Sequence, residues 1–249
     1  MRLKETIDYL CAWMREQVHA AGAAGVVLGI SGGLDSAVAG AIAQAAFPRT
    51  CTGLIMPCAS MAEDELHGKL LAQKIQLEFK VIDLTQIYEN MALLLQTANI
   101  SDHANKQLLE ANIKARLRMI TLYYYAQKHN RLVLGTCNKC EIAIGYFTKH
   151  GDGGADLQIL GDLMKSEVLA LAEYLEIPME IRSKAPSGGL WPGQIDEKEM
   201  GLTYADLEKY LHGLPVFAPV QKKIETMANQ SRHKRTMAPV AVIPEPLRG

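Results

Sequence analysis

Residues 31–36, with the sequence SGGLDS, are the part of this chain best suited to chemistry on a phosphate. They follow the apolar run 26–30 and precede an Ala-rich stretch, which predicts a turn between a strand and a helix. Glycines at such a turn leave backbone N–H groups bare beside the positive end of the helix dipole, and Ser31 and Ser36 add hydroxyl donors. The segment lacks the lysine of a P-loop and the glycine spacing of a dinucleotide fingerprint. It therefore predicts a different kind of phosphate-binding loop.

Asp35 within this loop points to a cation. Its carboxylate would repel a phosphate unless a positive ion lay between them, and Mg²⁺ prefers carboxylate and phosphate oxygens as ligands. The alternative is an ordinary tight turn in which a Ser or Asp side chain caps the following helix. The loop alone leaves both interpretations open.

Short apolar strands alternate with helical patterns on both sides of this loop. Residues 3–20 have the three-and-four apolar spacing of an amphipathic helix. We predict strands at 26–30, 52–56, 79–84 and 131–136. We predict further helices from the loop to about 46, at 62–77, at 84–128 with an interruption near Ser101, from 138–141 to about 147, and at 165–175.

This alternation predicts an α/β fold with a doubly wound, mainly parallel sheet and helices on both faces. Ligands of such sheets bind beyond the carboxyl ends of the strands. The predicted strands end at residues 31–33, Pro57, Asp83 and residues 135–136. We expect these to converge on one crevice.

Composition excludes several classes of protein. Lys and Arg number 26 against 27 Asp and Glu, so the chain has no basic field to hold a nucleic acid. No apolar run is long enough for a signal segment or a membrane span, which leads us to expect a cytoplasmic protein. The chain has 5 cysteines, an odd number at irregular spacing, and no secretion signal, so we expect reduced thiols rather than a disulfide framework. Cys137 and Cys140 form a C-x-x-C without a second pair, so we expect buried thiols rather than a zinc or redox motif.

The loop resembles the pyrophosphate loop of the N-type ATP pyrophosphatases, which implies an adenine nucleotide alpha hydrolase-like fold. The second half of the chain resembles the NAD synthetases within that superfamily, and the resemblance extends over nearly the whole chain from about Gly25. Its motifs are LGT at 134–136, NK at 138–139, Glu141, GYFTK at 145–149, GDGGADL at 151–157, GDL at 161–163 with Lys165, LWPGQ at 190–194, DE at 196–197, GLTY at 201–204 and HKR at 233–235. The chain departs from the family at Gly188-Gly189, where Ala-Asp is common, and at Ile159-Leu160, where a proline is frequent.

The resemblance implies a role for individual residues. Asp35 and Glu141 would be the Mg²⁺ ligands, and Lys165 would stabilise the departing pyrophosphate. Contacts to ATP would come from Gly29, Ile30, Ser31, Gly32, Gly33, Leu34, Asp35, Ser36, Thr136, Lys165 and Ser187. Contacts to deamido-NAD would come from Arg116, Lys149, Asp156, His233 and Lys234.

Each of these roles has a plainer alternative when the resemblance is set aside. Glu141 equally suits an exposed acid in the first turn of a helix. Arg116 equally suits a charged solvent-facing helix surface, and residues 232–235 a solvated basic run. No side chain is an obvious nucleophile, so positioning and electrostatics would carry the catalysis.

The activity implied is ATP-driven adenylation of the carboxylate of deamido-NAD, followed by amidation with ammonia to give NAD, AMP and pyrophosphate. NAD synthetases that use glutamine carry an additional amidase domain. We expect residues 1–249 to form a single synthetase domain without a glutaminase domain. The resemblance also implies a homodimer, with the N-terminal helix and residues 84–128 as candidate interface.

Two rival functions remain, a pyrophosphatase with the same loop and a regulatory module of similar fold. A tRNA-modifying pyrophosphatase would need a basic appended surface, which the net charge of -1 disfavours. A regulatory module that binds an adenine nucleotide without turnover would not need both Asp35 and Glu141.

Overall fold

The computed structural model describes residues 1–95 and 103–248, and its centre is a parallel sheet. The strands are β1 (Gly25–Gly29), β2 (Cys51–Ile55), β3 (Glu78–Val81), β4 (Arg131–Gly135) and β5 (Leu157–Gln158). They pair in the order β3-β2-β1-β4-β5, and every pairing is parallel. The predicted mainly parallel α/β sheet is confirmed.

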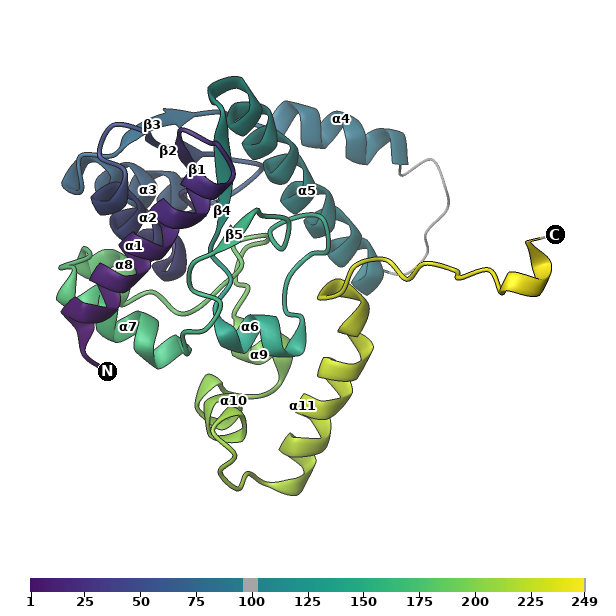
Figure 1. The fold of residues 1–249 in the computed structure, drawn as a ribbon. Coiled ribbons are helices and arrows are strands. Elements are labelled where there is room, and N and C mark those ends of the chain that lie inside the picture. The colour runs from purple at the N-terminus through teal and green to yellow at the C-terminus, as the bar shows by residue number, and fades with distance from the viewer. Residues whose placement is uncertain (96–102, 249) are drawn as a thin grey trace.

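Helices cover both faces of this sheet (Figure 1). The core of one face is built with α1 (Leu3–Ala20), α2 (Leu34–Ala46), α3 (Ala62–Lys74), α7 (Lys165–Tyr174) and α8 (Met179–Arg182). The core of the other face is built with α4 (Thr85–Leu95) and α5 (His103–His129).

Alternate residues of each strand enter opposite cores. Val26 and Leu28 of β1 pack with α1 and α2, whereas Val27 packs with α4 and α5. In β4, Leu134 enters the same core as Val26 and Leu28, and Val133 enters the same core as Val27. Because both faces of these central strands are apolar, β1 and most of β4 appear in the sequence as apolar runs, whereas the edge strand β3 is largely exposed.

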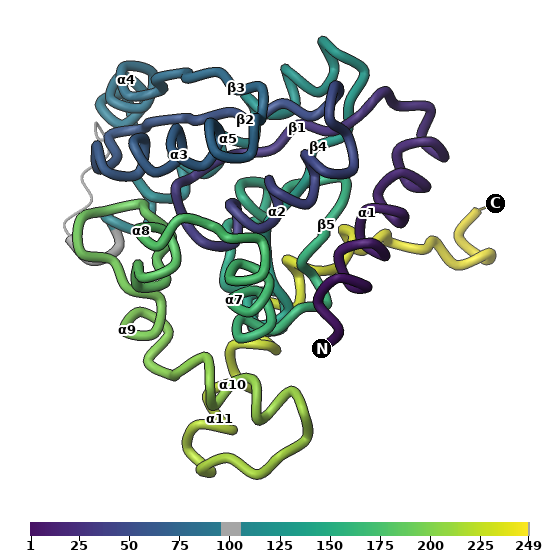
Figure 2. Tube along the Cα trace, turned by 90° about the vertical axis from the view of Figure 1, so that its left-hand side faces the viewer, coloured from purple at the N-terminus to yellow at the C-terminus, as the bar shows by residue number. Residues whose placement is uncertain are grey.

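A smaller core holds the last third of the chain together. It joins α6 (Lys139–Ile144) to α9 (Asp196–Met200), α10 (Tyr204–Leu211) and α11 (Ala218–Gln230). Both views show α10 and α11 extending away from the sheet (Figures 1 and 2). Tyr204 and Met200 are buried in this core against Cys140 of α6. The helix α6, which carries Glu141, is therefore held in place by packing against the C-terminal helices α9, α10 and α11.

Several predicted boundaries are corrected by the structure. The third strand ends at Val81 rather than at residue 84. The helix predicted to end near residue 147 stops at Ile144, because Gly145 adopts a φ of 69° and a Cβ there would lie 2.2 Å from the Cβ of Ser231. The helix predicted at 62–77 ends at Lys74, before Gln76 at φ 52°. The interruption predicted near Ser101 lies outside the described residues.

The chain after Arg235 leads away from the body in both views and ends in the short 3-10 helix η2 (Glu245–Leu247) (Figures 1 and 2). Met237, Val240 and Val242 in this tail are exposed. Across the described residues, none of the helices combines the length and apolarity that a bilayer crossing requires.

Candidate active site

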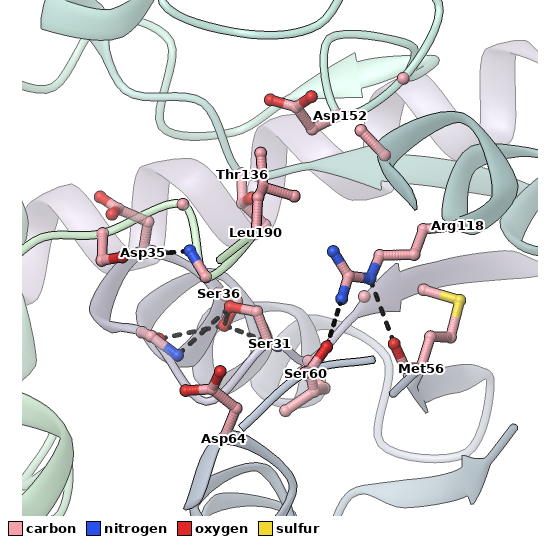
Figure 3. Close-up of a pocket in the computed structure, with 18 of the residues that line it drawn as sticks. Ser31, Asp35, Ser36, Met56, Ser60, Asp64, Arg118, Thr136, Asp152 and Leu190 are labelled. Carbon is pink, nitrogen blue, oxygen red and sulfur yellow. Dashed lines mark hydrogen bonds between the residues drawn. The ribbon is translucent and has the colours of Figure 1, made fainter. Parts of the chain in front are cut away.

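Residues 31–36 form a hydrogen-bonded turn between β1 and α2. The N–H of Ser31 donates to Ser36 Oγ at 3.1 Å, and the N–H of Gly33 donates to Ser31 Oγ at 3.2 Å. The two hydroxyl oxygens lie 2.9 Å apart (Figure 3). Leu34 begins α2, so the positive end of that helix dipole faces the same space. The turn has the donors and the field that an oxyanion needs.

Gly32 is required by both its conformation and its surroundings. Its φ is +77°, and a Cβ there would lie 2.3 Å from the carbonyl oxygen of Asp64 in α3. Gly32→Ala should raise the KM for ATP, the nucleotide that the sequence resemblance implies, about tenfold or more, since the turn must shift to relieve strain of roughly 1–3 kcal/mol. Gly22→Ala is the matched control, because Gly22 has φ +63° but meets no atom within 4 Å. Equal KM values for the two variants would contradict this role of Gly32.

A cavity of about 730 Å³ opens beyond the carboxyl ends of β1, β2 and β4. All the residues assigned to ATP line it except Gly32, and Glu141 lines it too. Asp83 does not line it, although the strand pattern suggested that it would. Instead, Asp83 Oδ1 accepts a hydrogen bond from the N–H of Thr85 at the start of α4.

Asp35 and Lys165 form an ion pair at the edge of this cavity. Lys165 is only 8% exposed and its Nζ lies 5.2 Å from the centre of the Tyr204 ring. Burial lowers the pKa of Lys165, but the Asp35 and Glu141 carboxylates outweigh it and the net pKa is raised. The lysine therefore stays charged.

Glu141 lies beside this pair in a capping box at the start of α6. Its N–H donates to Asn138 Oδ1 at 3.0 Å, while its Oε2 accepts from the N–H of Asn138 at 2.9 Å. The Asn138 amide also donates to Asp35 Oδ1 at 3.3 Å, so one side chain holds both acids. Burial first, and then the charge of Asp35, raises the pKa of Glu141 to about 8.

Two neighbouring half-buried carboxylates suit a divalent cation that would relieve their repulsion. Within residues 1–95 and 103–248, no group of three or more His, Cys, Asp or Glu side chains is arranged to hold a metal ion. The protein ligands of a cation at this site would thus be the carboxylates of Asp35 and Glu141, and its remaining ligands would come from phosphate and water.

Glu141→Gln should stabilise the protein in EDTA at high pH. A carboxyl whose pKa rises from 4.5 to about 8 on folding contributes stability below pH 4.5 and loses it as the pH rises through 8. Glutamine keeps the oxygen that accepts from Asn138 but never ionises. We expect its Tm to exceed that of the wild type by roughly 5 °C at pH 9, with the gain vanishing near pH 5. Calorimetry tests this, and a lower Tm at pH 9 would contradict it.

Arg118 is a cavity residue that the sequence did not reveal. Its Nε donates to the carbonyl of Met56 at 3.1 Å and its guanidinium donates to Ser60 Oγ at 2.9 Å (Figure 3). Burial lowers its pKa. The signal was the helical stripe Ala115, Arg118, Met119 and Leu122, which all line the cavity.

A second lysine–aspartate pair on the cavity wall was also missed. Lys184 pairs with Asp64, whose backbone packs against Gly32. The two residues lie 120 positions apart, so no local pattern could join them.

The residues assigned to deamido-NAD lie outside this cavity. Lys149 Nζ donates to the carbonyl of His233 at 2.6 Å, and Arg116 donates to the carbonyl of Lys149 at 3.4 Å. Lys234 Nζ donates to the carbonyls of Gly145 and Phe147, at 2.9 and 2.7 Å. The structure thus gathers Arg116, Lys149 and residues 233–234 around one surface region.

Asp156, the remaining residue assigned to deamido-NAD, is held by hydrogen bonds. It accepts from the N–H of Val133 at 2.7 Å and from the hydroxyl of Tyr123 at 3.1 Å. Cys137 and Cys140 are both buried, and burial raises the pKa of the Cys140 thiol to about 11.

Comparison with known proteins agrees with this geometry. Residues 6–238 match the NAD synthase family. The NH(3)-dependent NAD(+) synthetase of Syntrophomonas wolfei is 48% identical over 248 residues, which is 100% of both chains. The structure of NMN synthetase from Francisella tularensis matches with a TM-score of 0.90 and 39% identity, covering 98% of this chain and 99% of that one. The structure of NH3-dependent NAD synthetase from Campylobacter jejuni matches with a TM-score of 0.78 and 27% identity, covering 97% of this chain and 100% of that one. With its phosphate loop, its acid pair and its matched length, the chain belongs to the NAD synthase family.

Proposed function

We propose that this chain is an ammonia-dependent NAD synthetase, which adenylates the carboxylate of deamido-NAD with ATP and lets ammonia displace AMP. The observation that carries the proposal is the cluster of Asp35, Lys165 and Glu141 beside a phosphate loop, inside a cavity with room for a nucleotide. Relatives of similar length are named NH(3)-dependent NAD(+) synthetases, which supports ammonia as the nitrogen donor.

In the first step, a carboxylate oxygen of deamido-NAD attacks the α-phosphorus of ATP and the bond to the β-phosphate oxygen breaks. Pyrophosphate leaves with the electron pair of that bond. Lys165 is charged and almost buried, so it can offset the negative charge that grows on the leaving group. In the structure the N–H of Gly33 and the hydroxyls of Ser31 and Ser36 bond within the turn, so they must turn toward the polyphosphate to hold it.

Mg²⁺ is the proposed cofactor, held by Asp35 and Glu141 together with phosphate oxygens. When bound, it would neutralise charge on the phosphates as a Lewis acid. In the structure Asp35 pairs with Lys165, so Lys165 must share this carboxylate or turn toward phosphate when the cofactor and ATP bind.

In the second step, the nitrogen of neutral ammonia attacks the acyl carbon, the bond from that carbon to the AMP oxygen breaks, and the amide nitrogen loses a proton to solvent. The adenylate must be protected from water meanwhile. Residues 184–194 form one wall of the cavity and suit this task.

For deamido-NAD we propose contacts with Arg116, Lys149, Asp156, His233 and Lys234. Support comes from the surface region where Lys149 meets His233 and Arg116. The ammonium of Lys149 and the guanidinium of Arg116 suit dinucleotide phosphates.

We propose a single synthetase domain that acts in the cytoplasm as a homodimer. Ile87 and Met91 on α4, and Ile120 and Tyr124 on α5, expose apolar surface on neighbouring helices. Sedimentation should show a dimer across a wide concentration range, and a monomer throughout would count against it.

The test of the activity is to incubate the protein with ATP, Mg²⁺, ammonia and deamido-NAD and to measure AMP and NAD. Both should appear in equal amounts, at a rate that rises above neutral pH as more ammonia is neutral. ATP binding without AMP formation would instead favour a regulatory nucleotide-binding module.

A second candidate substrate is nicotinate mononucleotide, whose amidation by the same chemistry gives NMN. It is favoured by the TM-score of 0.90 to a protein named NMN synthetase. Parallel assays with deamido-NAD and the mononucleotide decide between them. A higher kcat/KM for the mononucleotide would replace deamido-NAD in the proposal.

A further inference from the structure

Residues 184–194, here called the covering segment, are anchored on one side by two lysines. Every residue of the segment lines the cavity. Lys114 of α5 donates to the carbonyl of Leu190 at 2.9 Å, and Lys184 pairs with Asp64 of α3. Lys114 and Asp64 belong to α5 and α3, which pack on the sheet, so this side of the segment is bonded to the main body.

The other side of the covering segment is tied to α9. The N–H of Asp196 donates to the carbonyl of Pro186 at 3.0 Å. Gln194 accepts from the N–H of Leu190 at 2.9 Å and donates to Glu199 at 2.9 Å. Movement of α9 would therefore move the segment.

The Asp196 carboxylate joins this anchor to Glu141. It is 3% exposed and accepts from the hydroxyls of Tyr204 and Tyr146, at 3.0 and 3.1 Å. The same Tyr204 hydroxyl lies 3.4 Å from Glu141 Oε1. A continuous chain of polar contacts thus runs from Glu141 through Tyr204 and Asp196 to Pro186 in the cavity wall.

The chemistry of a hydroxyl makes this chain sensitive to what Glu141 binds. A tyrosine hydroxyl has a single hydrogen, so it donates to Glu141 or to Asp196 but not fully to both. When the Glu141 oxygens coordinate a cation, the hydrogen is left to Asp196. That strengthens the bond that fixes α9 and the covering segment.

We propose that Asp196 and Tyr204 are positioning residues that couple the Glu141 carboxylate to the covering segment, so that cation binding tightens the segment over the cavity. The coupling rests on the proposed role of Glu141 as a Mg²⁺ ligand. Neither residue needs to touch the substrate, and both act through their neighbours.

Trp191 in the covering segment provides the reporter. The chain has 2 tryptophans, and Trp13 lies in α1, so Trp13→Phe leaves Trp191 as the single emitter. The protein is titrated with Mg²⁺ in the presence of a constant concentration of α,β-methylene ATP, which cannot be cleaved at the bond in question. This measures binding without turnover.

Tyr204→Phe, made in the Trp13→Phe protein, removes the hydroxyl but keeps the ring over Lys165. We expect the Mg²⁺ midpoint of the Trp191 signal to rise about tenfold, the effect of losing a hydrogen bond to a charged group. AMP formation should need correspondingly more Mg²⁺, while kcat at saturating Mg²⁺ falls less than about threefold.

Tyr146→Phe is the matched control. Its hydroxyl lies within hydrogen-bond distance of Asp196 and Glu199, at 3.1 and 2.7 Å, rather than of Glu141. Its midpoint should change by less than about twofold. A Tyr204→Phe midpoint equal to that of the parent, or an equal shift in both variants, would overturn the coupling.

The coupling and the proposed function fail in different ways. Mg²⁺-dependent AMP formation without any Mg²⁺ response of Trp191 in the parent protein would overturn the coupling alone. AMP formation that is independent of Mg²⁺ would overturn the metal assignment, and the coupling with it.

Discussion

Asp35→Ala is expected to lower the rate of AMP formation by about 10³-fold or more, because it removes a cation ligand and the partner of Lys165 together. The structure adds a cost in stability. Lys165 is 8% exposed, and removal of Asp35 leaves its buried ammonium without an ion-pair partner, with only the more distant charges of Glu141 and Asp196 to offset it. We expect a loss of about 3 kcal/mol, or a Tm lower by roughly 6–12 °C, with the fold retained at 25 °C.

AMP formation and thermal unfolding of the same preparation test both effects. Asp162→Ala is the matched control, since Asp162 also pairs with a lysine but its side chain is 96% exposed. It should change neither quantity appreciably. Wild-type turnover by Asp35→Ala would remove Asp35 from the metal site, and an unchanged Tm would show that the ion pair contributes little.

Lys165→Met is expected to lower kcat by roughly 10²–10³-fold while the KM for ATP changes much less. Methionine keeps the length and apolar stem of lysine but removes the charge. The charge on pyrophosphate is greatest as the bond breaks, so the lost interaction belongs to the transition state rather than to bound ATP. Steady-state kinetics at saturating Mg²⁺ separate the two constants.

Lys139→Met is the control for this change. Lys139 lies near the start of α6 and pairs with Asp162 at 2.9 Å, in a more exposed position. Its kcat should stay within about twofold of the wild type. If Lys165→Met raised KM and left kcat unchanged, Lys165 would bind ATP without assisting the bond cleavage.

The strands β1, β2 and β4 were predictable because they are largely buried on both faces and appear as mostly apolar runs, whereas the edge strand β3 is largely exposed. β5 was not, since Leu157–Gln158 is too short to produce any periodicity. α11 was not predicted because prolines in this part of the chain suggest irregular structure. Pro219 instead lies in the first turn of that helix, where a missing N–H costs nothing.

The phosphate loop was predictable because its donors are consecutive in the sequence. The contacts of Glu141 were not, because they join separate elements. Tyr204 lies 63 positions from Glu141, and only the packing of α10 against α6 brings them together. Arg116 and Arg118 show the same difficulty within one helix, since two positions apart on a helix means nearly opposite directions.

The strand order has a consequence for how the protein is made. β1 occupies the middle of the sheet, yet its second neighbour β4 pairs through Arg131 with Gly25, more than 100 residues earlier. At translation rates of roughly 5–20 residues per second, one edge of β1 waits many seconds on the ribosome for its partner. Until residues 131–135 are made, that edge of β1 is therefore open to pairing with other strands.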